Sequence, residues 1–432
     1  MDISGEKNII LVAGIPTTYA LEAYQTYCKK EKKKFRFLLL HDKDKKKLSA
    51  VEEKLEYFDF IEKVDFGSVK SVGKVVNKYQ GYLKAAIAGG GESNVVRYSK
   101  VVPFVTYLNV PTASSLKCAT DKLLMRRRLK AFDKNITPVY SLLRKNTEKK
   151  VSRAIKKIGF PMIIKPVNLS MSLLVDIAYY KEELTDTLGR IFRKINKQYK
   201  DANRSEKPQV ILEEFMEGKE YSVDCYVDNK GEVYFCPLVG VKRAFDIGVD
   251  DFFHYRRFVP TKLNGGSREE AKEAAKKAVH AIGLKNSTAH VEMMKTEDGW
   301  KIVEIGSRLG GYRHKMYEYS FGINHALNDF LIKLGKKPRI PKKVRGYTAV
   351  FEIFADKEGR IESLRGIQKA PKLKSVIDFD VKMKVGDKAR FAKRGGKRVI
   401  QVTMFNKDRS KLLADIRRME KMINIKIKNG KK

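Results

Sequence analysis

Two glutamates stand in the apolar segment AHVEMMKTEDGWKIVEIGSRLGG, residues 289–311. Glu292 and Glu304 are each flanked by valine, isoleucine or methionine, in runs that would otherwise be predicted as core. A buried carboxylate pair either shares a proton or holds a cation. The alternative is an exposed hairpin with solvated acids, and the apolar neighbours on both strands argue against it. We therefore favour a divalent-cation site formed by Glu292 and Glu304.

The loop between the two glutamates decides whether they meet. Asp298-Gly299 supplies turn chemistry, so the segment is predicted to be a β-hairpin. A two-residue turn at Asp298-Gly299 would put the glutamates on opposite faces. A three-residue loop, Glu297-Asp298-Gly299 with the glycine left-handed, pairs them directly, with Cβ atoms about 5 Å apart. The metal hypothesis therefore predicts the three-residue loop.

Two basic residues could act on phosphate near such a metal. Lys165 ends the strand-like run FPMIIKPV (160–167) and could neutralise a phosphate. Arg308 follows Glu304 by four residues and could clamp the same oxyanions. Taken singly, a strand-end lysine in solvent and a surface arginine in a glycine loop are the alternatives.

The stretch VILEEFMEGKEYSVD offers groups that suit a nucleoside. A predicted strand runs into Glu213, whose carboxylate could accept from an adenine amino group. The backbone of Phe215 and Met216 could meet the ring edge, and Glu220 could accept from ribose hydroxyls. An acidic turn after a strand is the alternative for this stretch alone.

The elements that must position these residues fall into three predicted domains. Residues 1–118 alternate apolar strands with helical patterns, which is typical of an open α/β sheet. The strand candidates are 8–14, 35–42, 58–66, 83–90 and 101–108, and the helical segments include TTYALEAYQTYCKK. The sequence GIPTTYA follows the first strand in place of a G-x-G-x-x-G, so dinucleotide binding has weak support.

The second domain, residues 119–338, opens with a helix and continues with strands at 160–167, 209–216, 220–228 and 231–241. An amphipathic helix at 267–284 precedes the hairpin, and a further helix covers 323–335. Residues 344–432 form a predicted α+β domain. It contains a hairpin turning at Glu358-Gly359, a strand RVIQVTMFN and a closing helix.

Composition limits the classes of partner. The net charge is +39, from 90 basic and 51 acidic residues, and such a field attracts polyanions. The lysines, however, are spread over runs such as 29–35, 43–47, 144–150 and 336–343, without a nucleic-acid recognition motif. A solvated basic surface is therefore favoured, and nucleic-acid binding stays a weaker alternative.

Cysteine usage and hydropathy indicate a cytoplasmic protein. The four cysteines show no CxxC spacing, so neither a zinc site nor a disulfide framework is predicted. Apolar runs are too short to cross a bilayer, and the N-terminus lacks a charged leader with a cleavable apolar segment. A homodimer is compatible with these features.

Read together, the TDK…MR opening, the IIKP strand, the EEFMEGKEYSVD hinge and the VEMM…DGWKIVEIGSRLGG ending resemble the ATP-grasp superfamily. The resemblance is to L-amino-acid ligases and other carboxylate–amine ligases, with biotin-carboxylase-like members as a second branch. It implies a pre-ATP-grasp domain at 1–118, an ATP-grasp domain at 119–338 with a lid subdomain at about 151–216, and a C-terminal α+β domain at 344–432.

The resemblance also implies a site. Lys122 and Lys165 would contact ATP phosphates, and Ser170 and Ser172 would lie in the lid loop. Glu292 and Glu304 would hold Mg²⁺ between the β- and γ-phosphates. Glu213 and the backbone of Phe215 and Met216 would hold adenine. Glu220 would hold the ribose, and Arg308 would act on the transferred phosphate.

The activity implied is phosphorylation of a small carboxylate, such as an amino acid, to an acyl phosphate that an amine then attacks, with release of ADP and phosphate. The alternatives are a biotin-carboxylase-like carboxylating ligase, or a non-catalytic ATP-binding or polyanion-binding protein. The loop 242–264 is expected to border the acceptor substrate. Six residues are candidates there or nearby: Arg243, His254, Arg256, Arg257, Arg313 and His314.

Two features depart from the family's pattern. The lid loop reads KPVNLSMSLLV, with Ser170 and Leu174 where glycines stand in D-alanine–D-alanine ligases. Without glycine, backbone amides approach a phosphate less freely. In addition, Gly306 replaces an asparagine that serves many members as a further metal ligand, and Mg²⁺ can keep water there instead.

Overall fold

The computed structural model describes residues 7–43, 52–202, 204 and 206–428. The outermost residues of the first and third predicted domains and most of the lysine run 43–47 lie outside this part of the chain. None of the described helices combines the length and apolar character needed to cross a bilayer.

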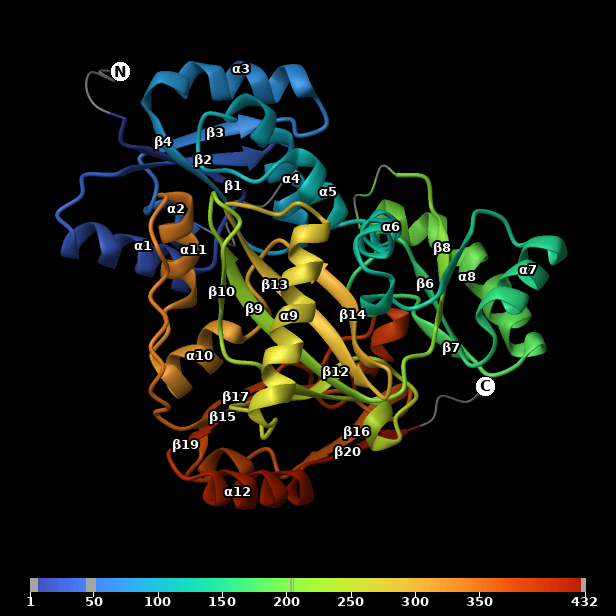
Figure 1. Ribbon diagram of the computed structural model, residues 1–432. Helices are drawn as coiled ribbons and strands as arrows, with labels where there is room; N and C mark the ends of the chain where they lie inside the picture. Colours follow the sequence, from blue (N-terminus) through green and yellow to red (C-terminus); the bar gives the residue numbers. More distant parts are fainter. Residues whose placement is uncertain (1–6, 44–51, 203, 205, 429–432) are drawn as a thin grey trace.

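The N-terminal part is a parallel sheet in the order β3–β2–β1–β4 (Figure 1). Strands β1, β2 and β4 are mostly buried apolar runs, as parallel strands covered by helices require, whereas the edge strand β3 is partly exposed. Helices α3 and α4 pack on one face, and α1 packs on the other. The elements are β1 (Ile9–Ala13), α1 (Thr18–Lys30), β2 (Arg36–Asp42), α2 (Glu52–Leu55), β3 (Phe60–Val64), α3 (Val69–Tyr79), β4 (Leu83–Ala88), α4 (Glu92–Val101) and α5 (Ala113–Cys118).

The predicted strand at 101–108 is wrong. Residues 102–104 form a 3₁₀ turn that continues α4. Val101, Val102 and Val105 are buried against the sheet from this turn. A short apolar run does not distinguish a buried strand from a buried helical turn.

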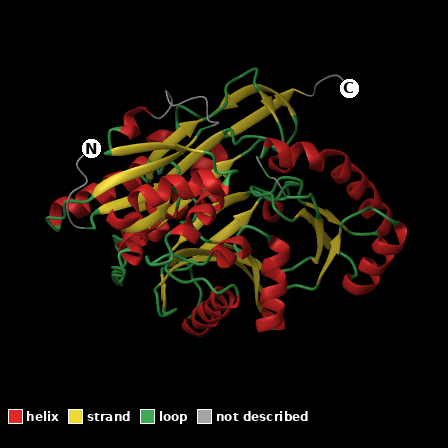
Figure 2. Ribbon diagram, turned by 90° about the horizontal axis from the view of Figure 1, so that it is seen from above, coloured by secondary structure: helices red, strands yellow, loops and turns green. Residues whose placement is uncertain are grey.

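The lid is an antiparallel sheet in the order β5–β8–β6–β7, with helices on its outer side (Figures 1 and 2). Helix α6 (Lys122–Phe132) leads into it. Its elements are β5 (Tyr140–Leu143), α7 (Glu148–Ile158), β6 (Met162–Pro166), β7 (Asp176–Ala178), α8 (Lys181–Asp201) and β8 (Val210–Glu214).

A large antiparallel sheet forms the body, in the order β14–β13–β9–β11–β12–β15–β19–β17, with β10 beside β9. Helix α9 covers one face, and α10 and α11 pack on the other. The elements are β9 (Lys219–Val227), β10 (Val233–Phe235), β11 (Val239–Arg243), β12 (His254–Val259), α9 (Gly265–Ala281), β13 (Ser287–Thr296), β14 (Gly299–Gly306), α10 (Arg313–Phe321), α11 (His325–Lys333), β15 (Tyr347–Ile353), β17 (Val376–Val381) and β19 (Ile400–Asn406).

The hairpin predicted to turn at Glu358-Gly359 is wrong. Strand β15 pairs with β12 and β19 in the large sheet, whereas β16 (Gly359–Arg365) belongs to a separate sheet with β18 (Lys388–Ala389) and β20 (Asn424–Lys428). Helix α12 (Arg409–Met422) is the predicted closing helix. The large sheet therefore continues past residue 344, and the C-terminal region is joined to the body by strand pairing.

Helix α11 ties the large sheet to the N-terminal sheet. Phe330 is fully buried, with ring centroids 4.8 Å from Tyr24, 5.6 Å from Tyr27 and 6.4 Å from Phe37. Truncating a buried phenylalanine removes apolar contacts and leaves a cavity. This contact therefore contributes to the stability of both parts.

We expect Phe330→Ala to lower the free energy of unfolding by about 3–5 kcal/mol, measured by urea denaturation. Phe132→Ala on α6 is the matched control, because that ring is 54% exposed, and its effect should stay below about 0.5 kcal/mol. Equal losses in the two variants would contradict this account.

Candidate active site

A pocket lies between the lid and the large sheet. Its wall contains all the predicted site residues except Arg308: Lys122, Lys165, Ser170, Ser172, Glu213, Phe215, Met216, Glu220, Glu292 and Glu304. They come from α6, the lid strands, the loop after β6, and strands β9, β13 and β14. Arg308 lies in the loop after β14, and its charge contributes to lowering the pKa of Glu292.

Glu292 and Glu304 are paired across the β13–β14 hairpin, as the metal hypothesis requires. The predicted three-residue loop is wrong, because Thr296 pairs with Gly299 and leaves a two-residue turn. Met293 pairs with Ile302. The register shifts between Met293 and Glu292, so that Glu292 pairs with Glu304. The extra residue, Val303, is the bulge that returns both carboxylates to one face.

Alternation along the strands explains why acids stand among apolar residues. Val291 and Met293 face the core under α9, together with Val223 of β9. Glu292, between them, points to the opposite face, where it lies beside Ser222 of β9. One face of these strands is therefore core and the other is the wall of the pocket.

Lys165 and Glu213 form an ion pair at the lid side of the pocket. Glu213 Oε2 lies 2.8 Å from Lys165 Nζ, and Arg126 of α6 donates to both Glu213 oxygens at 2.8 and 2.9 Å. Burial raises the pKa of Glu213, but the charges of Arg126 and Lys165 outweigh it and lower the pKa to about 2. Glu213 therefore holds Lys165 in place, in addition to the adenine contact predicted for it.

Lys122 lies at the start of α6 and reaches two parts of the site. Its Nζ donates to the carbonyl of Leu169 at 2.6 Å and lies 3.5 Å from Glu304 Oε1. Burial lowers the pKa of Lys122, but the acids around it, Glu304 first, raise it above the ordinary value. A charged ammonium therefore stands between the lid loop and the predicted metal ligand.

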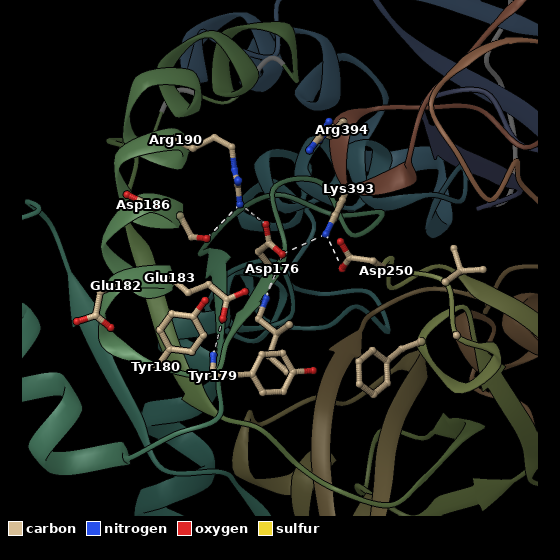
Figure 3. Close-up of a pocket in the computed structure, with 15 residues that line it drawn as sticks. Asp176, Tyr179, Tyr180, Glu182, Glu183, Asp186, Arg190, Asp250, Lys393 and Arg394 are labelled. Carbon is tan, nitrogen blue, oxygen red and sulfur yellow. Dashed lines mark hydrogen bonds and ion pairs between the residues drawn. The ribbon is translucent and has the colours of Figure 1, made fainter. Parts of the chain in front are cut away.

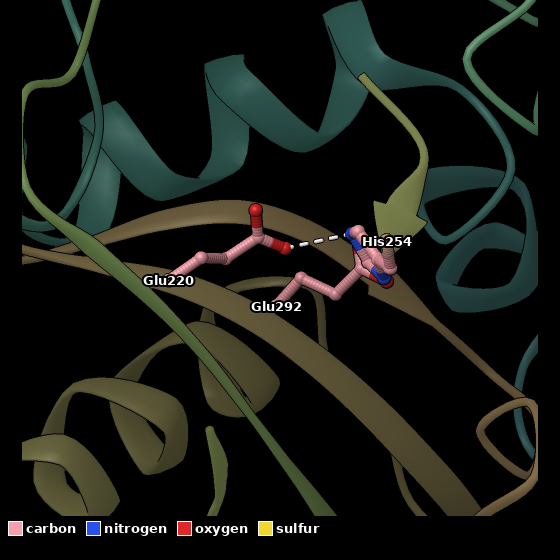
Figure 4. Close-up of side chains that lie close together, drawn as sticks. All are labelled: Glu220, His254 and Glu292. Atoms are coloured by element: carbon pink, nitrogen blue, oxygen red, sulfur yellow. Dashed lines mark ion pairs between the residues drawn. The ribbon is translucent and has the colours of Figure 1, made fainter. Parts of the chain in front are cut away.

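Glu220, His254 and Glu292 point toward one another from β9, β12 and β13 (Figure 4). Each offers a ligand atom, and these atoms lie within 4.8 Å of one another. His254 Nε2 lies 2.8 Å from Glu220 Oε1, yet that buried oxygen has no hydrogen bond of acceptable geometry among the described residues. The site thus presents a buried acceptor together with a cation-binding set.

Asp224 connects strand β13, which carries Glu292, to the loop that carries Arg308. Its carboxylate is fully buried and accepts from His290 and His325, each at 2.6 Å, and from the Gly310 amide at 2.8 Å. His290 Nε2 then lies 3.2 Å from Glu292 Oε1. Burial raises the pKa of Asp224, but the two histidines lower it well below its usual range. Such a buried carboxylate–histidine pair fixes the direction of the next ligand.

Two backbone contacts were predicted at the adenine edge. The amide of Phe215 donates to the carbonyl of Pro161 at 3.2 Å, so only its carbonyl remains for a ligand. The Phe215 ring packs against Phe245, at 5.7 Å between centroids. Met216 also lines the pocket.

The lid loop adopts glycine-type backbone conformations without glycine. Met171, Ser172 and Leu174 have φ of 58°, 57° and 57°. Each such residue costs about 1–2 kcal/mol relative to the right-handed region. Without glycine, the left-handed backbone of this loop therefore depends on contacts that hold it in place.

The acceptor-site candidates separate into three groups. Arg243 and His254 line the pocket, as expected for residues of the loop 242–264. Arg257 is paired with Glu352 at 2.8 Å and Arg256 packs over a phenylalanine ring, so both serve the packing of β12 on β15. Arg313 is buried beside Asp224, and burial lowers the pKa of His314 to about 4.

Sequence reasoning missed Arg126, Asp224 and His290. A signal for Asp224 was present, because Glu220, Ser222 and Asp224 alternate with apolar residues along one strand. Arg126 stands in an Arg-Arg-Arg run that is indistinguishable from the many other basic runs.

We expect Glu213→Gln to reduce the free energy of unfolding at pH 7 by about 3–5 kcal/mol, because two buried cations lose their anion. The depressed pKa contributes stability that is complete above about pH 4.5 and is lost toward pH 2. Urea denaturation should therefore show that the free energy of unfolding falls less between pH 7 and pH 3 in the variant than in the wild type. Glu269→Gln, with a side chain 71% exposed, is the control, and a loss as large there would contradict the account.

Comparison with known proteins identifies part of the chain directly. Residues 158–315 match the family model of the ATP-grasp domain. Over 275 residues the chain is 24% identical to a D-alanine–D-alanine ligase of Buchnera aphidicola subsp. Schizaphis graminum, covering 60% of this chain and 83% of that protein. It is 28% identical over 207 residues to an alanine–anticapsin ligase of Bacillus subtilis, covering 44% and 42%. An uncharacterised protein of Sinorhizobium fredii is 22% identical over 64% of this chain and 54% of its own length. The match with these last two spans less than two thirds of each relative.

Solved structures share the fold over nearly the whole chain. An L-amino acid ligase from Bacillus licheniformis superposes with a TM-score of 0.75 and 16% identity, covering 99% of this chain and 100% of that one. An N5-carboxyaminoimidazole synthetase from Staphylococcus aureus, solved with ADP, superposes with a TM-score of 0.66 and 13% identity, covering 97% and 98%. Residues 158–315 therefore match an ATP-grasp domain, and the chain as a whole shares the fold of these solved structures.

Proposed function

We propose that this chain is an ATP-dependent carboxylate–amine ligase. The observation that carries the proposal is the pairing of Glu292 and Glu304 on the open face of the sheet, opposite the buried Lys165 of the lid. The relatives named as D-alanine–D-alanine ligase and alanine–anticapsin ligase support this class of reaction. The finer proposal is a small carboxylate substrate, such as an amino acid, that is phosphorylated and then joined to an amine.

The donor set fits Mg²⁺. Glu292 and Glu304 are partly exposed, at 20% and 32% of the side chain, so they leave room for the water ligands that this ion retains. We assign these two residues as its ligands and Gly306 as a position where water serves. Bound there, the ion would neutralise phosphate charge and polarise the transferred group.

The pocket also fits a nucleotide. Its lid side carries Lys165 and Lys122 for phosphate oxygens, and its far side carries the buried acceptor of Glu220 for a ribose hydroxyl. The Phe215 carbonyl and Met216 border the adenine position. Serines 170 and 172 bring hydroxyl groups to the lid loop over the phosphates.

The residues of this chain act mainly by position and charge, as phosphoryl transfer requires. In this proposal Lys122 and Lys165 hold the phosphates, and Arg308 stabilises negative charge on the transferred group. Asp224 orients His290, which in turn contacts Glu292 and keeps it in orientation. Arg243 and His254 border the side on which the acceptor substrate would lie.

The test is ADP formation with a panel of amino acids as carboxylate and amine, using wild type and Glu304→Ala. We expect the wild type to release ADP with at least one pair, and the variant to lose about 100-fold or more, because Mg²⁺ loses one of two protein ligands. Glu297→Ala at the exposed tip of the same hairpin is the matched control and should keep wild-type turnover.

Other outcomes distinguish the alternatives. ADP formation with bicarbonate in place of the amino-acid carboxylate would favour a biotin-carboxylase-like reaction. ADP binding without turnover by any pair would favour a non-catalytic nucleotide-binding protein. Salt-dependent binding of RNA or DNA without ADP binding would favour a polyanion binder and contradict the ligase.

A further inference from the structure

A segment of the C-terminal region reaches across to the lid. We call residues 390–396, which contain a 3₁₀ turn at Ala392–Arg394, the strap. The carbonyl of Lys393 accepts from the Leu174 amide at 3.0 Å. Its ammonium lies 3.1 Å from Asp176 of β7 and 2.8 Å from Asp250 (Figure 3). One residue thus joins the lid loop, a lid strand and a loop of the body.

The strap is itself held firmly to the body. The fully buried carboxylate of Asp251 accepts from the amides of Ala392 at 2.5 Å and Lys393 at 3.1 Å. The turn is tight, because a Cβ on Gly396 would lie 1.9 Å from the Arg390 carbonyl oxygen. The strap therefore has a fixed position relative to the body and can hold the lid loop, which it contacts at Leu174.

The lid loop needs such a contact. Met171, Ser172 and Leu174 all occupy the left-handed region that favours glycine. The loop is anchored at Leu169 by Lys122, and at Leu174 by the strap. Between these anchors, Ser172 donates to the carbonyl of Phe252 at 3.3 Å.

Lys393 acts on the pocket only through this loop. Leu169, Ser170, Met171, Ser172 and Val175 line the nucleotide pocket, whereas Lys393 lines a separate cavity of about 670 Å³. That cavity separates the lid from the body around Asp176 and Asp250, so the ammonium bridges a gap (Figure 3). Without the ion pairs of Lys393 with Asp176 and Asp250, the lid loop could move away from its left-handed conformation.

We propose that Lys393 is a positioning residue for ATP: the strap holds the lid loop in a left-handed backbone conformation that glycine would adopt without strain. This inference rests on the proposed function, since it assigns the loop to the nucleotide. It requires that Lys393 influence nucleotide affinity more than turnover, and that glycine in the loop reduce the need for the strap.

The first experiment compares Lys393→Met with wild type in the full-length protein. We expect the Kd for ADP, measured by calorimetry, and the KM for ATP to rise about tenfold, with kcat within about twofold. Asp250→Asn removes one partner of Lys393 at a carboxylate whose side chain is 72% exposed, so folding is not at risk, and should raise the Kd about threefold. Lys426→Met, which breaks a surface pair with Glu362 in the C-terminal region, is the control and should leave the Kd unchanged.

The second experiment tests rescue. Leu174→Gly alone should change the Kd by less than about twofold, whereas Leu174→Gly added to Lys393→Met should recover at least about threefold of the lost affinity. Non-additivity of this kind identifies a shared role for the two positions. A Lys393→Met protein that binds ADP like wild type, or a double variant as weak as Lys393→Met, overturns the inference. A wild type that binds no ADP overturns the proposed function as well, so the two failures are distinguishable.

Discussion

Ion pairing of buried charge is the constraint on which this site depends. Carboxylates buried near the pocket would be costly alone, and each has partners: Glu213 is paired with Arg126 and Lys165, and Asp224 is hydrogen-bonded to two histidines. These pairs fix the lysine that faces the lid side of the pocket and the histidine that orients Glu292. The charges that would act on a nucleotide are therefore held by contacts within the protein, which lowers the cost of organising the site on binding.

The same pairing connects the lid to the body. Lys122 joins the lid loop at Leu169 to strand β14 at Glu304 through its side chain, whose flexible stem can span a gap between elements. Lys393 accepts from the Leu174 amide through its backbone carbonyl, and its ammonium reaches Asp176 and Asp250. A lid loop built without glycine can then follow a left-handed path, because contacts at both ends hold residues that would relax in isolation.

The net charge of +39 includes basic residues exposed at the surface and basic residues buried near the pocket. Basic runs along the chain keep their charges in water, where they interact weakly with one another. Inside the pocket, by contrast, each buried basic residue has a defined partner, and Arg126 shows how one arginine of a basic run becomes a structural ion pair. Net charge alone therefore could not separate these two populations, and only the contacts do so.

Most of the strands and helices, the two-faced hairpin and the residue types of the site were predictable from the amino-acid pattern, although the segment 101–108 is helical rather than extended. These depend on local periodicity, and Glu292, Glu304, Lys165 and Glu220 stand where the alternation of apolar and polar positions put them. Only the tertiary structure decided the bulge at Val303, the partners of Glu213 and the strap that reaches the lid loop. Each of these joins residues far apart in the chain or depends on how neighbouring strands pair, and such contacts have no signature in a local pattern.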